Sequence, residues 1–231
     1  MHLNELAQNA PVLTHKQGVV HKDRLRGSID ISLNAEGVAQ AREMATVLAG
    51  QIDKIYSSPL QRAMTTATEV LKTNPKVGSV IKADPLYSIC MGAFEGQLTE
   101  IAQPKINEYL IKTPYLNMPG RNAMSSRPGE SFNQFVYRLC NFFQMIEDTR
   151  PIGQTILLST HVFNIVTLKA YLDDGVIMNL NVNPQVLVKR HPIDPSDLYY
   201  FNPKTVTLDG AEDANTVGLY IMRHGRTDFN N

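Results

Sequence analysis

The strongest constraint on the fold is a continuous apolar run that leads directly into a predicted helix. Residues 155–159 read Thr-Ile-Leu-Leu-Ser, which is typical of a parallel strand covered on both faces. The pattern that follows predicts a helix over residues 162–172. Strands and helices alternate along the rest of the chain, and this alternation predicts an α/β fold. We therefore expect a three-layer sandwich, with a mainly parallel sheet between helices and with ligands bound beyond the carboxyl ends of the strands.

The other predicted elements continue this alternation. Helices are expected over residues 34–50, 60–72 and 131–147. Asn34 is a suitable N-cap for the first of them and Gly50 a suitable stop. The third carries an apolar stripe at helical spacing, formed by Phe132, Phe135, Val136, Leu139, Phe142, Phe143 and Ile146. Further strands are predicted over residues 52–56, 79–83, 185–188, 199–201 and 218–222.

Length and composition favour a single domain that binds neither nucleic acid nor membranes. The 231 residues suit one sizeable α/β domain, in which residues 1–23 form an irregular arm and residues 84–130 an insertion over one face. Lys plus Arg and Asp plus Glu both number 22, so no global field attracts nucleic acid or an acidic membrane. Cys90 and Cys140 lie far apart without metal-ligand spacing. We expect a cytoplasmic protein that binds neither membranes nor nucleic acid.

The last predicted strand runs into the residues that carry the chemistry of this chain. Arg223, His224 and Gly225 follow the apolar run, and Thr227 and Asn230 lie a few positions further on. An Arg-His-Gly tripeptide alone often arises by accident, so its weight depends on the segments that accompany it.

Four other segments match a known family in its cyclic order. They are 24–34 (Arg-Leu-Arg-Gly-Ser-Ile-Asp-Ile-Ser-Leu-Asn), 56–67 (Tyr-Ser-Ser-Pro-Leu-Gln-Arg-Ala-Met-Thr-Thr-Ala), 128–132 (Pro-Gly-Glu-Ser-Phe), which leads into a helix containing Arg138, and 158–161 (Leu-Ser-Thr-His). Together with the terminal Arg-His-Gly, they resemble the signature of the histidine phosphatase superfamily, the phosphoglycerate mutase-like enzymes. The resemblance implies the phosphoglycerate mutase-like form of the α/β sandwich, with one such domain over residues 1–231.

The resemblance also implies a role for each candidate site residue. His224 would be the nucleophile and hold the phosphoryl group as phosphohistidine, which divides one difficult displacement into two easier steps. The implied catalytic set is His224, Arg223, Arg62 and His161, to which we add Glu95 as a candidate replacement for the family's acid. The implied substrate-binding set is Asn230, Thr227, Gly225 and Arg26. Arginine suits a phosphoryl group because its planar guanidinium donates to two oxygens and stays charged. The implied partner is a small phosphorylated substrate, and neither a metal nor an organic cofactor is expected.

The order of the motifs departs from that of the family, whose members carry Arg-His-Gly near the start of the chain. Moving residues 217–231 ahead of Arg24 restores the usual succession, so we interpret the chain as circularly permuted. A partial duplication is the rival interpretation, because residues 12–16 (Val-Leu-Thr-His-Lys) precede Arg24 at nearly the usual interval and keep His15. A terminal strand that inserts into a sheet can also enter the sheet of a second copy, which leaves a homodimer open.

The proton donor is the second departure. Breaking a phosphate ester requires an acid that protonates the leaving oxygen, and relatives commonly supply a Glu where this chain has Ser88. Glu95 and Asp84 lie close in sequence and are the candidate replacements. The alternative for Glu95 is a loop carboxylate paired with a backbone amide or an arginine.

These observations predict a phosphomonoester hydrolase that acts through phospho-His224. A protein of another class, which binds phosphate ligands or signals with weakened turnover, stays open because of Ser88. A phosphoglycerate mutase fits less well, since the Glu-Arg-His-Tyr-type segment of mutase relatives has no counterpart around residues 87–90.

Overall fold

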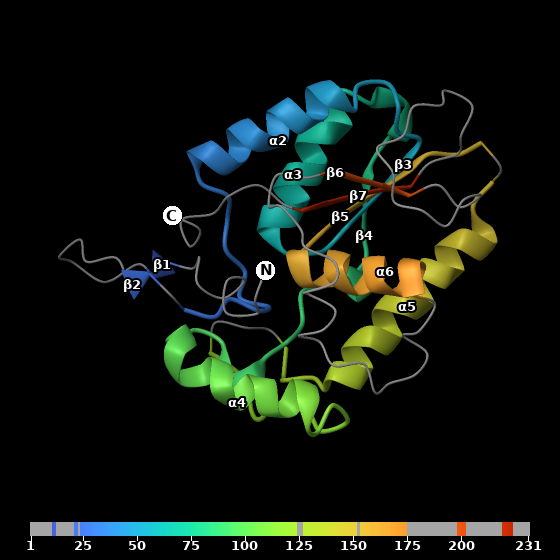
Figure 1. Cartoon of the computed structure of the whole chain (residues 1–231). Coiled ribbons are helices and arrows are strands. Elements are labelled where there is room, and N and C mark those ends of the chain that lie inside the picture. The colour runs from blue at the N-terminus through green and yellow to red at the C-terminus, as the bar shows by residue number, and fades with distance from the viewer. Residues whose placement is uncertain are drawn as a thin grey trace.

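A five-stranded sheet forms the centre of the computed structural model (Figure 1). The structure describes residues 11–12, 21–22, 24–123, 127–151, 153–174, 198–201 and 219–223. The sheet has the order β4-β3-β5-β7-β6, and its strands are β3 (Lys54–Ser57), β4 (Val80–Lys82), β5 (Ile156–Thr160), β6 (Leu198–Phe201) and β7 (Leu219–Arg223). All neighbours pair in parallel except β6, which is antiparallel to β7. The prediction of a mainly parallel sheet is therefore confirmed.

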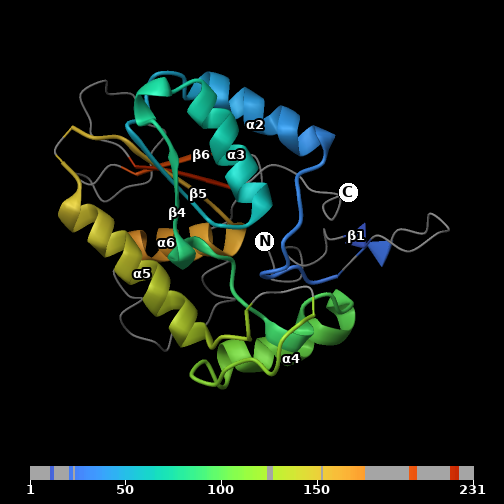
Figure 2. The ribbon, with the colours of Figure 1, turned by 180° about the vertical axis from the view of Figure 1, so that it is seen from behind.

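Helices cover both faces of this sheet, as a three-layer sandwich requires. α2 (Ala35–Val47) and α3 (Gln61–Lys72) lie on one face, and α5 (Phe132–Thr149) and α6 (Val162–Asp174) lie on the other (Figures 1 and 2). α4 (Thr99–Ile111) lies away from the sheet, on the side of α5 and α6. Among the described ranges, no helix combines the length and apolar character needed to cross a membrane.

The core divides at β5 into two apolar clusters, one on each side of the sheet. Leu157 packs with residues of α2 and α3, whereas Ile156 and Leu158 pack with residues of α5 and α6. All five residues of β5 are buried, because alternate side chains of a strand point to opposite faces and both faces are covered. The apolar run thus forms the buried strand that its composition predicts.

Local capping signals set the starts of two helices. The Asn34 side chain accepts a hydrogen bond from the Gly37 amide at 2.8 Å, and α2 begins at the next residue. Ser131 and Gln134 form a reciprocal capping box at the start of α5, which satisfies backbone amides that would otherwise lack acceptors. α2 ends at Val47, slightly earlier than predicted, and the stop residue Gly50 occupies the following turn with φ +72°.

The predicted insertion, residues 84–130, contains a helix that sequence patterning did not reveal. α4 carries Pro104 inside it, and an internal proline ordinarily argues against a helix because it removes one backbone hydrogen bond. Burial of Ala102, Ile106 and Leu110 stabilises α4 against the remainder of the domain. The predicted strand 185–188 lies outside the described residues.

The last strand of the chain occupies an internal position in the sheet. β7 lies between β5 and β6, and its residues Leu219 to Arg223 are in register with Ile156 to Thr160 of β5. Near the start of the chain, β1 (Pro11–Val12) pairs with β2 (His21–Lys22) in a separate two-stranded sheet.

Candidate active site

The carboxyl ends of three neighbouring strands meet at one edge of the sheet. Ser57 of β3 is in register with Ser159 of β5, and Thr160 of β5 is in register with Arg223 of β7. The residues that follow, Ser58 and His161, therefore begin at this same edge. Parallel α/β sheets bind their ligands here, so the predicted location of the site agrees with the strand register.

His161 is fixed by a buried hydrogen bond. Its Nε2 lies 2.8 Å from the Ser58 Oγ, and the two residues are 3% and 0% exposed. The Ser58 amide donates to the Ser159 carbonyl at 2.9 Å, which ties the serine to β5. Ser58 thus holds the ring of His161 in one orientation, with the direction of the hydrogen bond set by the tautomer of the histidine. Sequence reasoning quoted Ser58 within a motif but gave it no role.

Arg62 is a buried arginine in the first turn of α3. It is 2% exposed, and its two terminal nitrogens donate to the Ile29 carbonyl at 2.8 Å and the Gly27 carbonyl at 3.0 Å. A lone solvated charge, the ordinary role of an arginine at a helix start, is therefore excluded. The guanidinium fixes the loop of residues 24–30 against α3 and contributes a positive charge where water is largely excluded.

Asp30 strengthens the same contact from the loop side. Its carboxylate accepts a hydrogen bond from the Gln61 amide, the first amide of α3, at 2.7 Å. A carboxylate at a helix N-terminus is stabilised by the exposed N–H groups and by the helix dipole. The motif residues 24–30 and 56–67 consequently form one unit, although they are separate in sequence. Arg26, the predicted substrate contact on this loop, is half-buried.

Glu95 is a buried carboxylate that organises this loop. It is 1% exposed, and its Oε1 accepts hydrogen bonds from the Ser28 amide at 2.7 Å, the Ser28 hydroxyl at 2.9 Å and the Met91 amide at 2.9 Å. Gly27 beside it has φ +47°, and a Cβ there would collide with the Glu95 side chain. These contacts support the loop-carboxylate alternative. The assignment of Glu95 as proton donor stays a prediction.

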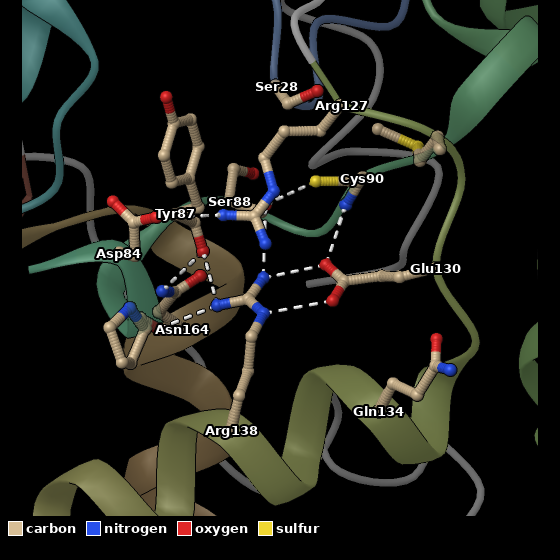
Figure 3. Close-up of polar contacts among 12 residues, drawn as sticks. Ser28, Asp84, Tyr87, Ser88, Cys90, Arg127, Glu130, Gln134, Arg138 and Asn164 are labelled. Atoms are coloured by element: carbon tan, nitrogen blue, oxygen red, sulfur yellow. Dashed lines mark hydrogen bonds and ion pairs between the residues drawn. The ribbon is translucent and has the colours of Figure 1, made fainter. Parts of the chain in front are cut away.

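The segment around Ser88 is held by polar side chains of α5 and α6 (Figure 3). Arg138 of α5 donates to the carbonyls of Pro85 at 2.6 Å, Tyr87 at 3.1 Å and Ser88 at 3.3 Å. Asn164 of α6 donates to the Leu86 and Tyr87 carbonyls at 3.0 and 2.9 Å. This clamp fixes the backbone of the segment that contains Ser88, the position at which the resemblance predicts an acid.

Glu130 completes the clamp. Its two carboxylate oxygens receive hydrogen bonds from Arg138 at 2.6 and 2.9 Å, and Oε1 also accepts from the Cys90 amide at 2.9 Å. The pairing is bidentate and largely buried, which makes it geometrically specific. The sequence contained the signal for this pair, since Glu130 and Arg138 both belong to the motif at 128–132 and its following helix.

The two cysteines are free, buried thiols. Burial, and then the negative charge of Glu130, raises the pKa of Cys90 to about 12. Burial alone raises the pKa of Cys140 to about 12. The thiolate is the reactive form, so burial and the raised pKa values argue against a nucleophilic role for either cysteine. Within the described ranges, no group of His, Cys, Asp and Glu side chains could hold a metal ion.

Several predicted site residues are not among those described. The backbone of Arg223 ends β7 at the site edge, but His224, Gly225, Thr227 and Asn230 lie outside the described residues, as does the rival nucleophile His15. Of the predicted catalytic residues whose side chains are described, Arg62 and His161 lie at the edge of the sheet where β7 ends.

Comparison with known proteins identifies the family. The family description "Histidine phosphatase superfamily (branch 1)" matches residues 17–182. The chain belongs to this superfamily. The matched residues include Arg62 and the loop that it holds, the clamp around Ser88, and also His161. The match ends before β7.

Individual relatives agree with this membership. Phosphoserine phosphatase 1 of Hydrogenobacter thermophilus is 30% identical over 139 residues, which cover 60% of this chain and 63% of that protein. This chain thus spans slightly less than two thirds of that relative. A phosphoserine phosphatase of Entamoeba histolytica, solved with 3-phosphoglyceric acid, has a TM-score of 0.53 at 25% identity, with 72% of this chain and 76% of its own covered. A mycobacterial glucosyl-3-phosphoglycerate phosphatase, at 21% identity and a TM-score of 0.53 over 71% and 76% of the two chains, shares the fold.

Proposed function

We propose that this protein is a phosphomonoester hydrolase that acts through phospho-His224 and requires no metal. Membership of the histidine phosphatase superfamily supports a hydrolase of that type, and the phosphatase names of the relatives support phosphate esters as substrates. The observation that carries the proposal is the convergence of Arg62, His161 and the end of β7 at one sheet edge. A cytoplasmic location stays a prediction from the sequence.

The internal position of β7 supports His224 over His15 as the nucleophile. β7 is paired in parallel with β5, the strand that leads to His161, so residue 224 follows in sequence a strand whose carboxyl end lies at the site edge. The rival segment, residues 12–16, begins at β1, which pairs with β2 outside the main sheet. We therefore propose a circular permutation in which residues 217–231 supply the nucleophile strand. Exchange of that strand between two copies stays a prediction.

The proposed reaction has two displacements at phosphorus. A ring nitrogen of His224 forms a bond to phosphorus as the ester P–O bond breaks, and the leaving oxygen departs with the electron pair of that bond. Water then attacks the phosphohistidine, which releases inorganic phosphate and returns the nitrogen to its free form. Arg62, Arg223 and His161 would stabilise the charge on the phosphoryl oxygens during both steps.

A single pair of variants tests the nucleophile. His224→Ala is expected to abolish hydrolysis of p-nitrophenyl phosphate in the presence of a chelator, together with labelling of the protein by a radioactive phosphate ester. Labelled protein should be trapped in denaturant at alkaline pH, because phosphohistidine is labile in acid. His15→Ala is the matched control and should retain both properties.

The alternative functions predict different results in the same assays. If His15→Ala loses labelling and His224→Ala retains it, the nucleophile is His15 and not His224. Binding of phosphate esters by the wild-type protein without labelling or turnover would identify the binding or signalling protein that Ser88 leaves open.

A further inference from the structure

Arg127 comes from the insertion and lies over the segment where an acid would be expected. Its guanidinium carbon is 4.7 Å from the ring centroid of Tyr87, and its Nη1 is 3.9 Å from the Asp84 carboxylate. Its charge also acts on the Cys90 thiol. Ser88 lies in the chain between two residues that Arg127 reaches, Tyr87 and Cys90, and Figure 3 shows this cluster.

This cluster adjoins the loop that Arg62 holds. The side chain of Cys90 interacts with that of Ser28, and Ser28 lies between Gly27 and Ile29, whose carbonyls bind Arg62. The positive charge of Arg127 is therefore close to the loop that borders the proposed phosphoryl site.

The carboxylates around this segment are engaged by other groups. Glu130 is paired in bidentate fashion with Arg138, and Glu95 binds the Ser28 and Met91 amides. Asp84 points toward Arg127 across 3.9 Å with a side chain that is 78% exposed. Exposed ion pairs of this kind are weak, so an incoming anion can compete with Asp84 for the guanidinium.

We propose that Arg127 stabilises the leaving oxygen of the substrate as an anion, in place of an acid that protonates it. This inference rests on the proposed phosphohistidine mechanism and defines the substrate class of the same site. The preferred substrates are phosphomonoesters whose leaving groups depart as stable anions, such as aryl and enol phosphates. As the P–O bond breaks, its electron pair stays on the leaving oxygen and pairs electrostatically with the guanidinium. Arginine keeps its proton throughout, because its pKa is too high for it to act as an acid.

The leaving group takes part only in the first displacement, and this separates the proposal from its alternatives. Arg127→Gln should slow phosphorylation of His224 by p-nitrophenyl phosphate and by phenyl phosphate about 100-fold, the usual effect of removing one preorganised donor. Hydrolysis of the phosphohistidine should keep its wild-type rate, since the leaving group has already gone. Both rates are measured by rapid quench with labelled substrates. Arg121→Gln, an exposed arginine of the same insertion, is the matched control and should change neither rate.

A series of leaving groups supplies the second readout. The wild-type rate of phosphorylation should fall steeply from p-nitrophenyl phosphate to phenyl phosphate to glycerol phosphate. Ser88→Glu should flatten this dependence, because it returns an acid to the segment. A urea unfolding curve of each variant checks that the variant protein is folded.

The possible failures are distinct. If wild-type protein is never labelled, the phosphohistidine mechanism is wrong. If it is labelled, but Arg127→Gln phosphorylates at the wild-type rate or glycerol phosphate reacts as fast as p-nitrophenyl phosphate, the mechanism stands and the role of Arg127 is refuted. If Arg127→Gln slows both steps equally, Arg127 acts on the phosphoryl group and the leaving-group role is likewise refuted.

Discussion

Replacing Glu95 by Gln separates a carboxylate that holds a loop from one that donates a proton. The Glu95 Oε1 accepts three hydrogen bonds, from the Ser28 amide, the Ser28 hydroxyl and the Met91 amide, at 2.7 to 2.9 Å. Glutamine has nearly the same shape and keeps an oxygen for these donors. It removes the negative charge, and with it any ability to supply a proton.

The size of the effect follows from these contacts. A hydrogen bond to a charged group contributes about 1.5–3 kcal/mol and a neutral one about 0.5–1.5 kcal/mol, so loss of charge weakens each bond by about 1–1.5 kcal/mol and the three together by about 3–4.5 kcal/mol. Burying a neutral amide costs less than burying a carboxylate, which offsets part of this loss. We expect Glu95→Gln to lower the free energy of unfolding by about 1–2 kcal/mol. Glu95→Ala leaves the Ser28 and Met91 amides unsatisfied and should cost about 3–5 kcal/mol.

Two assays measure the consequences. Urea unfolding gives the stability change, and the hydrolysis rates of p-nitrophenyl phosphate and glycerol phosphate give the dependence on the leaving group. If Glu95 holds the loop, Glu95→Gln lowers both rates by a similar factor, because the geometry of the Arg62 loop affects every substrate. Glu43→Gln, an exposed residue of α2, is the control and should alter neither stability nor rates.

The opposite pattern would refute this reasoning. A Glu95→Gln protein with wild-type stability, normal hydrolysis of p-nitrophenyl phosphate and a large loss with glycerol phosphate would show that Glu95 is the acid. Good leaving groups need little protonation, so only a proton donor produces that selective loss.

Two further predictions concern contacts at the carboxyl and amino ends of the strands. Ser58→Ala removes the 2.8 Å contact to His161 and should lower kcat/KM about 10-fold and stability by about 1–3 kcal/mol; an unchanged kcat/KM would show that Ser58 does not position the ring. Burial acts to raise the pKa of Asp53, but hydrogen bonds from the Thr155 amide and Lys76 outweigh it and the pKa is lowered. The stabilisation is therefore present at neutral pH and is lost as the pH falls below about 4. Asp53→Asn should cost about 0.5–1.5 kcal/mol at pH 7 and progressively less in acid, as urea unfolding at several pH values would show; a constant difference would exclude this linkage.

The elements with strong local signals were predictable from the sequence. The apolar run of β5 marks a strand buried on both faces, and the caps Asn34 and Ser131 set the starts of α2 and α5. α4 was not predictable, because Pro104 argues locally against a helix and only packing of its apolar face overrides that signal.

The residue types of the site were also evident in the sequence, whereas their contacts were not. The motifs singled out Arg62, His161, Glu95, Glu130 and Arg138, since phosphate chemistry favours arginine and histidine near strand ends. Which groups bind each other depends on loops from distant parts of the chain. The contact between Glu95 and Ser28 joins residues 67 positions apart, and no local pattern encodes it.

The family, the alternation of strands and helices, and the residues suited to bind a phosphoryl group can thus be recognised from the amino-acid sequence. These properties depend on side-chain chemistry and on periodicity within short segments. Three features emerge only in the folded molecule: the last strand lies inside the sheet beside β5, Arg62 is buried against the loop of residues 24–30, and Glu95 supports this loop. These features depend on which distant segments pack together, because burial and hydrogen bonding across the fold decide them.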